Sequence, residues 1–309
     1  MSEKTALALD IGGSKYIVGL VTRGGEIVDS VRGTWRELTA DCVMESLIDA
    51  SRQLLDKTGA RPDVCGATIP GLADSKAGVW VEASFSGIRD VPVCGILRAA
   101  MGIPAYCEND GQAYALAEIM FGMCAEVDDF LYINVSNGIG GAIVSGGRLV
   151  AGARGMAAEF GHCVAVESGR PCKCGTRGCL EMHAAGPGIA QNYAELGGAP
   201  MPDGTLPDAK EIARRARNGE SAALETFRLE GEYLGRMVAI ACNLMNPSAV
   251  VLGGGVSLAF DLFGEALKAA AEARMYRSAN PNVKIMPTRL GYMAGLFGAA
   301  AVGFAGLEG

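Results

Sequence analysis

The sequence predicts an α/β protein built from two similar halves, with a ligand cleft between the halves. Three observations lead to this fold class. Each half opens on apolar strands separated by a glycine-rich turn, and strands and helices then alternate. A loop in the second half carries closely spaced cysteines and a histidine, which is typical of a metal site. At 309 residues the chain is long for one hydrophobic core and fits two domains.

The first half reads as a three-stranded antiparallel meander followed by alternating helices and strands. Gly12 and Gly13 separate the first two strands, and Gly24 and Gly25 precede the third. The predicted strands are 5–11, 15–21, 26–31, 64–69 and 103–107, and the predicted helices include 41–57 and 109–120. This pattern predicts an N-terminal domain over residues 1–122.

The second half repeats this order and is interrupted by the cysteine-rich loop. Its predicted strands are 130–135, a strand ending at 144, 148–150, 249–252 and 283–286, and its predicted helices are 184–196, 208–218, 221–245, 258–274 and 294–304. We expect a C-terminal domain over 123–290 with the metal loop at 162–181. The final helix, within 291–309, is expected to pack back on the N-terminal domain.

Composition excludes several classes of partner. The net charge is −7 at pH 7, and no long lysine or arginine run offers a nucleic-acid surface. The first residues lead directly into an apolar strand that is too short to cross a bilayer and does not resemble a signal peptide. We therefore expect a cytoplasmic protein that binds neither nucleic acid nor membrane.

Three glycine-rich strand exits predict a site for nucleotide phosphates, because glycine lets backbone N–H groups approach an anion. None has the spacing of a P-loop or a dinucleotide-binding fingerprint, which points to ATP held in another way. The expected nucleotide residues are Asp10, Gly12, Gly13, Ser14 and Lys15, then Gly138, Ile139 and Gly140, then Gly253, Gly254 and Gly255. Each cluster can also be a simple tight turn, and the last can reflect close helix–strand packing.

Asn109 and Asp110 lie where a strand passes into a helix. Either can simply cap that helix. Alternatively, Asp110 accepts the proton of an attacking alcohol while Asn109 holds a neighbouring hydroxyl. Gly71 and Ser84 belong to further loops at strand ends, which are either walls of a polyol pocket or only turns.

The metal loop offers three thiolates and one imidazole, the ligand set that structural Zn²⁺ prefers. The expected ligands are His162, Cys172, Cys174 and Cys179. Cys163 competes with His162 for the fourth position, and a disulfide or chance spacing could account for the cysteines without a metal. The metal does not need Glu159 and Glu181, so both carboxylates remain for another role.

Taken together, these motifs resemble the ROK family, named for repressors, open reading frames and sugar kinases. The resemblance spans nearly the whole chain and is most specific in Glu159-x-Gly-His162 and in the loop from Cys172 to Glu181. It implies two actin-like (ribonuclease H-like) ATPase domains with an inserted zinc loop, closing on a hexose and ATP·Mg²⁺. It also implies a homodimer or homotetramer.

The same resemblance implies roles for individual residues. Asp110 matches the base that receives the proton of the sugar 6-hydroxyl. Positions that contact sugar hydroxyls match Asn109, Glu159, His162 and Glu181. Zinc would shape recognition and take no part in the chemistry.

Two departures from the family pattern bear on the substrate. Ser84 replaces a sugar-contacting asparagine, and Asn137 replaces a threonine. Serine lacks the paired donor and acceptor of an amide, which leaves the preferred epimer or N-acyl state open. We expect a glucokinase-like hexokinase, with N-acetylmannosamine or N-acetylglucosamine kinase as the alternative. A sugar-responsive, repressor-type member without a DNA-binding domain is the third choice.

Overall fold

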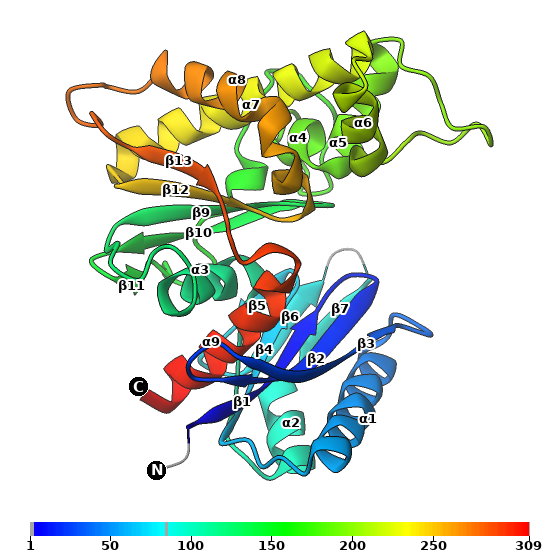
Figure 1. Ribbon diagram of the computed structural model, residues 1–309, viewed down its shortest axis with the longest axis vertical. Coiled ribbons are helices and arrows are strands. Elements are labelled where there is room, and N and C mark those ends of the chain that lie inside the picture. The colour runs from blue at the N-terminus through cyan, green and yellow to red at the C-terminus, as the bar shows by residue number, and fades with distance from the viewer. Residues whose placement is uncertain (1–2, 84–85, 309) are drawn as a thin grey trace. The chain divides into compact units, whose positions relative to one another are not determined.

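The computed structural model describes residues 3–83 and 86–308, so the predicted sugar residue Ser84 lies outside the described residues. The chain forms two compact units, each with a five-stranded mixed sheet (Figure 1). Unit 1 comprises residues 1–126, 149–157 and 292–309, and unit 2 comprises 127–148 and 158–291. Among the described residues, no helix has the length and apolar character needed to cross a membrane.

The sheet of unit 1 has the strand order β3-β2-β1-β4-β8. Its strands are β1 (Thr5–Ile11), β2 (Lys15–Thr22), β3 (Ile27–Thr34), β4 (Val64–Ile69) and β8 (Ala105–Asn109). The first three strands pair antiparallel, whereas β4 runs parallel to both β1 and β8. The carboxyl ends of β1, β4 and β8 therefore share one edge, which is where open α/β sheets bind ligands.

Helices cover both faces of this sheet (Figure 1). They are α1 (Ala40–Thr58) and α2 (Val93–Met101) on one face, and α3 (Asp110–Met120) and α9 (Ala294–Glu308) on the other. Along β1, large Leu7 and Leu9 face α1, and small Ala6 and Ala8 face α9. The small face allows close approach, since a Cβ at Gly66 would lie 1.9 Å from a carbonyl oxygen of α9.

A small antiparallel sheet in unit 1 is absent from the elements that the sequence predicts. It consists of β5 (Leu72–Asp74), β6 (Val79–Ala83) and β7 (Ile88–Val91). The buried Trp80 anchors it by donating an indole hydrogen bond to the Pro70 carbonyl at 3.0 Å. The segments at Gly71 and Gly87 are nevertheless turns at strand ends, as expected.

The sheet of unit 2 has the order β11-β10-β9-β12-β13, which corresponds strand for strand to unit 1. Its strands are β9 (Phe130–Val135), β10 (Ile139–Ser145), β11 (Arg148–Leu149), β12 (Ala249–Gly253) and β13 (Lys284–Pro287). As in unit 1, an antiparallel hairpin is followed by parallel pairing of the later strands. The predicted repetition of strand order is thus present.

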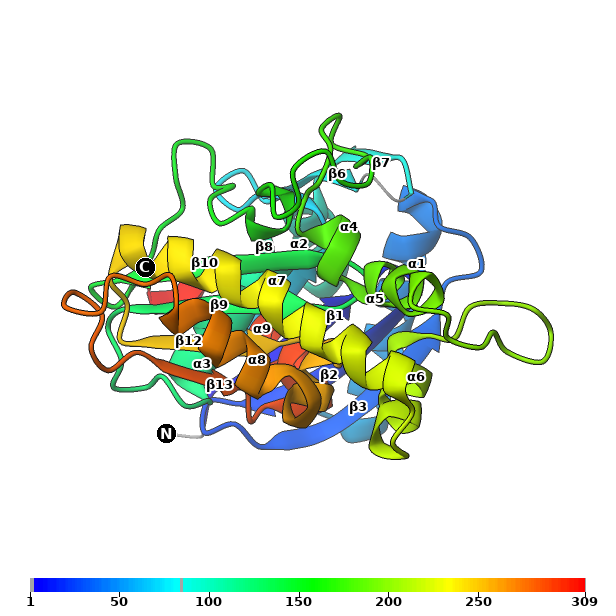
Figure 2. The same cartoon turned by 90° about the horizontal axis from the view of Figure 1, so that it is seen from above.

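The helices of unit 2 pack on its sheet around one apolar core. They are α4 (Glu181–Ala184), α5 (Gly186–Glu195), α6 (Ala209–Arg217), α7 (Ser221–Met245) and α8 (Phe260–Glu272), with the 3-10 helices η1 (Phe160–His162) and η2 (Gly255–Ala259). Figure 2 shows α7 and α8 side by side. Gly231 and Gly235 permit this contact, because a Cβ at either would lie within about 2.5 Å of α8 carbonyl oxygens.

The predicted helix 184–196 is present as α5 (Gly186–Glu195), and the separate short helix α4 precedes it. The chain leaves α4 at Ala185, which has an extended conformation, and α5 then begins with a proline in its first turn. Proline suits the first turn of a helix but cannot continue one, which explains the break.

Candidate active site

Asp10 lies at the end of β1, at the ligand-binding edge of unit 1. Its Oδ1 accepts a hydrogen bond from the Thr68 hydroxyl at 3.0 Å, and the same hydroxyl accepts the Ile11 N–H. Burial raises the pKa of Asp10, while Thr68 and then Lys15 act in the opposite direction. A Cβ at Gly295 would lie 2.2 Å from Oδ2 of Asp10, so the start of α9 comes directly against this carboxylate.

The first glycine-rich loop is a tight turn between β1 and β2. The Gly12 N–H donates to the Lys15 carbonyl at 2.9 Å, and the Gly12 carbonyl accepts from the Trp35 indole at 2.9 Å. Gly13 and Ser14 are exposed at the tip. The Lys15 ammonium donates to the Tyr292 hydroxyl at 2.7 Å, a partner that sequence reasoning missed because the two residues are far apart in the chain.

Asn109 and Asp110 join β8 to α3, and Asn109 does cap the helix. Its Oδ1 accepts from the Gly111 N–H at 2.9 Å and from the Gln112 N–H at 3.4 Å. Its Nδ2 donates to the Gly71 carbonyl at 2.7 Å, so two predicted sugar residues touch. Capping therefore fixes the amide in place without excluding a role for it in binding.

The Asp110 carboxylate lies in the first turn of α3, where the helix dipole favours a negative charge. Its Oδ1 accepts the Gly111 N–H at 2.8 Å, which restricts its rotamer. Glu108, two residues earlier on β8, accepts from the Ser75 hydroxyl at 2.5 Å, and burial raises the pKa of Glu108. Two neighbouring carboxyl groups thus lie in different environments.

In unit 2 the four predicted metal ligands lie together. One ligand atom from each of His162, Cys172, Cys174 and Cys179 falls within 4.8 Å of all the others. Nδ1 of His162 lies 3.8 Å from Sγ of Cys172, and the Cys174 and Cys179 sulfur atoms are 3.5 Å apart. A hydrogen bond with the Thr176 hydroxyl lowers the pKa of Cys174 to about 6, which favours a thiolate at neutral pH.

Cys163, the competing fourth ligand, does not join this group. Its Sγ lies 3.8 Å from the Glu159 carbonyl. With Nδ1 toward the cysteines, the other ring nitrogen of His162 lies 3.8 Å from Oε2 of Glu159. Burial raises the pKa of Glu159. The nearby His162 opposes this rise, and the nearby Glu181 adds to it. The histidine thus has one nitrogen toward the cysteines and one toward a carboxylate.

The second glycine-rich loop contacts Glu181 at Ile139. The Ile139 N–H donates to Oε2 of Glu181 at 3.0 Å. A Cβ at Gly138 would lie 2.7 Å from the same oxygen, so a larger residue there would displace the Glu181 carboxylate. A predicted sugar residue and a predicted phosphate loop are therefore in direct contact.

In the third loop, two of the three glycines are required by packing. A Cβ at Gly253 would lie 1.8 Å from the Tyr132 hydroxyl, and Gly254 has a φ of +83°. Gly255 is exposed, and a Cβ there would meet no described atom within 4 Å. Close packing thus explains the first two glycines but not the third.

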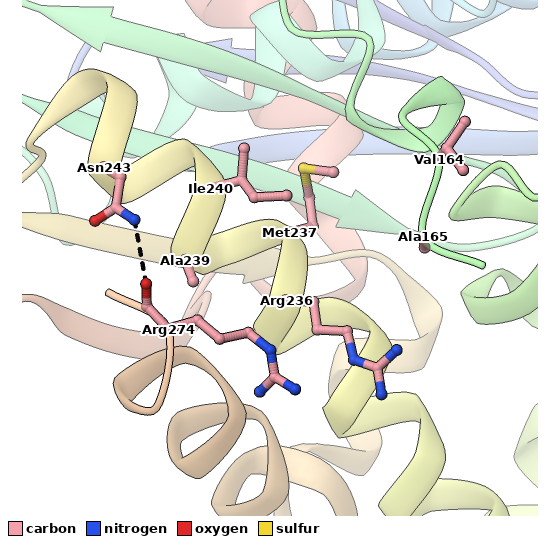
Figure 3. Close-up of a pocket in the computed structure, with 8 residues that line it drawn as sticks. All are labelled: Val164, Ala165, Arg236, Met237, Ala239, Ile240, Asn243 and Arg274. Atoms are coloured by element: carbon pink, nitrogen blue, oxygen red, sulfur yellow. Dashed lines mark hydrogen bonds between the residues drawn. The ribbon is translucent and has the colours of Figure 1, made fainter. Parts of the chain in front are cut away.

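A separate pocket of about 250 Å³ lies against α7, residues 164–165 and Arg274 (Figure 3). Its polar lining includes Arg236 and Asn243 from α7 together with Arg274. The Asn243 amide donates to the Arg274 carbonyl at 3.2 Å. None of the predicted site residues lines this pocket, so it is not part of the candidate active site.

Sequence comparison finds named relatives over almost the whole chain. The glucokinase of Thermotoga maritima is 30% identical over 316 residues, covering 98% of this chain and 98% of the relative. The N-acetylmannosamine kinase of Escherichia coli is 33% identical over 303 residues, covering 96% and 97%.

Solved structures with the same fold include a kinase and a regulator. A ROK family glucokinase from Streptomyces griseus in complex with glucose and AMPPNP matches with a TM-score of 0.86 and 28% identity, covering 97% of this chain and 99% of that one. A ROK family transcriptional regulator, homologous to the E. coli MLC protein, matches with a TM-score of 0.88 and 26% identity, covering 97% and 77%. The ROK family model matches residues 6–303, and the chain belongs to the ROK family.

Proposed function

We propose that this protein is a sugar kinase that transfers the γ-phosphoryl group of ATP to the 6-hydroxyl of a hexose. The observation that carries the proposal is the Gly71–Asn109–Asp110 cluster at the carboxyl end of β8, in a chain with named sugar-kinase relatives over almost its whole length. A carboxylate held in the first turn of a helix, beside an amide of fixed orientation, suits a sugar hydroxyl that must be aligned for attack.

In the proposed reaction, the 6-oxygen forms a bond to the γ-phosphorus as the bond from phosphorus to the bridging oxygen of ADP breaks. Asp110 accepts the hydroxyl proton as that bond forms, because an aspartate with a reference pKa of about 3.9 cannot deprotonate a ground-state alcohol. Positioning and charge stabilisation supply most of the catalysis in such transfers. Asn109 would orient the sugar, and Asp110 would receive the proton.

The nucleotide is assigned to the three glycine-rich loops, with Asp10 as the carboxylate nearest to a Mg²⁺ site. Mg²⁺ is commonly held by one or two carboxylates and by substrate phosphates. The half-buried Asp10, whose pKa is raised by burial, fits a position where a bound cation restores the charged form. The Lys15 ammonium would bind the phosphates in place of its present hydrogen bond to the Tyr292 hydroxyl.

We assign Zn²⁺ to His162, Cys172, Cys174 and Cys179, because three thiols and an imidazole within 4.8 Å of one another suit a closed tetrahedral site. Bound zinc would hold the loop that carries Glu159 and Glu181 and would polarise His162. The second nitrogen of His162 would then be free to donate to a sugar hydroxyl.

The substrate is assigned first to glucose and second to an N-acyl hexosamine. The assignments rest on relatives named glucokinase and N-acetylmannosamine kinase at similar identity. Initial rates of ADP release with glucose, mannose, N-acetylglucosamine, N-acetylmannosamine, fructose and allose distinguish them. The phosphorylated carbon is read by NMR. If no hexose releases ADP above the rate in sugar-free controls, the kinase proposal fails.

A regulator of the repressor type is the rival function, since the fold also occurs in a transcriptional regulator. Measurable affinity for a specific DNA sequence, without hexose-dependent ADP release, would favour it.

We further propose a cytoplasmic homodimer or homotetramer. Light scattering coupled to size-exclusion chromatography would contradict this assembly if it gave the 31.9 kDa of one chain.

A further inference from the structure

The segments on either side of the predicted metal loop 162–181 pack directly on the second glycine-rich loop and on β10, within unit 2. A Cβ at Gly161 would lie 2.2 Å from the Ile139 carbonyl oxygen, and a Cβ at Gly141 would lie 2.7 Å from the Phe160 ring. The Gly186 N–H also donates to the Ser136 carbonyl at 2.7 Å. These contacts leave little room for the two loops to move independently.

The Glu181 carboxylate is the side chain that bridges them. Its Oε2 accepts the Ile139 N–H at 3.0 Å and fills the space beside Gly138. No hydrogen bond engages its Oε1 within the described part of the chain. One oxygen thus holds the loop, while the other remains available to a sugar hydroxyl.

We propose that Glu181 is a positioning residue that fixes the conformation of loop 136–140 and thereby couples hexose binding to nucleotide binding. The proposal rests on the proposed function for the identity of the two ligands. A hexose hydroxyl bound to Oε1 limits the conformations of the Glu181 side chain. Because Oε2 of the same carboxylate holds the Ile139 N–H, the loop conformation at Ile139 is limited as well. Coupling between two sites is reciprocal, so hexose and nucleotide must raise each other's affinity by one common factor.

The same contact changes how the phosphate loop works. While Glu181 holds the Ile139 N–H, this amide does not serve a phosphate, and a negative carboxylate stands beside the loop. Phosphate binding must then use neighbouring positions such as Gly138 and Gly140, whose geometry the bridge sets. The glutamate therefore orients the loop rather than contacting the phosphate.

Hydrogen exchange at the Ile139 amide tests the bridge without any substrate. The wild-type protein and Glu181→Gln keep an acceptor at this distance and should protect the amide. Glu181→Ala removes the acceptor, and Glu181→Asp shortens the side chain by one methylene while keeping the charge. Both should raise the exchange rate of this amide by about tenfold or more, whereas equal exchange in all four proteins overturns the bridge. If Glu181→Ala fails to fold, the exchange rate of the Ile139 amide in Glu181→Asp tests the bridge instead.

Calorimetry with AMPPNP·Mg²⁺, with and without glucose, tests the coupling. We expect glucose to tighten nucleotide binding by about five- to fiftyfold in the wild-type protein, within the usual range of coupling energies. In Glu181→Ala the factor should fall to about one, and nucleotide should bind more weakly even without sugar. The matched control is Glu159→Ala. This variant removes another predicted sugar carboxylate, whose side-chain partner among the described residues is His162 rather than the phosphate loop.

Glu159→Ala should weaken glucose binding and leave sugar-free nucleotide affinity unchanged. If Glu181→Ala bound AMPPNP·Mg²⁺ in the absence of glucose as tightly as the wild-type protein does, the positioning role would be overturned. Glu181 would then be a sugar contact only. Failure of the proposed function is a separate outcome, since it would appear as no hexose-dependent ADP release from the wild-type protein.

Discussion

At the scale of single residues, the third glycine-rich loop separates a structural from a functional requirement. Gly253 and Gly254 are demanded by the buried Tyr132 and by a positive φ, whereas Gly255 faces open space. If Gly255 is there for the nucleotide, a methyl group at this position should disturb binding but not folding.

We therefore predict that Gly255→Ala raises the KM for ATP about tenfold, equivalent to about 1.4 kcal/mol. Its free energy of unfolding should stay within about 0.5 kcal/mol of wild type. Gly253→Ala is the contrasting variant and should lose about 1–3 kcal/mol through overpacking against Tyr132. Steady-state kinetics and urea unfolding measure both, and an unchanged KM in Gly255→Ala would remove this residue from the nucleotide site.

Glu230 is a second residue whose environment has a measurable consequence. It lies on α7 in the core of unit 2, fully buried, and neither carboxyl oxygen has a hydrogen-bond partner among the described residues. Burial raises its pKa well above the usual value. The folded protein therefore keeps a proton there that the unfolded chain releases near pH 4.5.

A raised carboxyl pKa makes the native state bind more protons than the unfolded state, so stability falls as pH rises above the unfolded pKa. Glu230→Met removes the buried polar group and should raise the free energy of unfolding at pH 8 by about 1–3 kcal/mol. The increase in the free energy of unfolding should be smaller at pH 5. Urea unfolding at both pH values provides the measurement, and destabilisation at pH 8 would show that the carboxylate is favourably bound.

At the scale of elements, the metal loop is held by more than its predicted ligands. The Arg170 guanidinium donates to the Met182 carbonyl at 2.9 Å, to Oδ1 of Asn192 at 2.6 Å and to Oε2 of Glu195 at 2.8 Å. Its backbone N–H donates to Nε2 of His183 at 3.3 Å, and burial lowers the pKa of that histidine. This arginine connects the loop to α4 and α5.

Arg170→Ala should therefore lower the free energy of unfolding by about 1.5–3 kcal/mol, the usual range for hydrogen bonds to charged groups. Arg177→Ala, at an exposed position of the same loop, is the matched control and should stay within about 0.5 kcal/mol of wild type. Thermal unfolding compares the pair. Equal stability of the two variants would mean that the Arg170 contacts contribute nothing.

The metal assignment makes its own prediction for this element. Metal analysis should find about one zinc per chain in the purified protein and none in Cys172→Ala, since a structural site needs its full thiolate set. Chelation should raise the KM for hexose more than the KM for ATP. Metal-free protein with wild-type kinetics would refute a structural zinc.

Most helices and strands could be predicted from the sequence, and contacts between residues that are distant in the chain could not. The apolar periodicity of α7 gave its bounds, and the glycine-rich turns located both hairpins. The strands β5 to β7 were not predicted, although the equally short β12 and β13 were. The contacts of Lys15 with Tyr292 and of Glu181 with Ile139 join residues far apart in sequence, which residue type alone does not reveal.

At the scale of the whole molecule, the two units repeat one strand order, and each carries part of the predicted site. Unit 1 holds the predicted base Asp110, and unit 2 holds Glu159, His162 and Glu181. The domain limits 1–122 and 123–290 and the joint action of both units on one hexose stay predictions.

The most direct test of the proposed kinase chemistry is the turnover of Asp110→Asn with the best hexose of the panel. The asparagine can still accept the Gly111 N–H but cannot take a proton. We predict that kcat falls by about 10²- to 10⁴-fold, the usual contribution of general base catalysis. The hexose dissociation constant, measured by calorimetry, should change by no more than about threefold. A kcat close to wild type would contradict the assignment of Asp110 as the base.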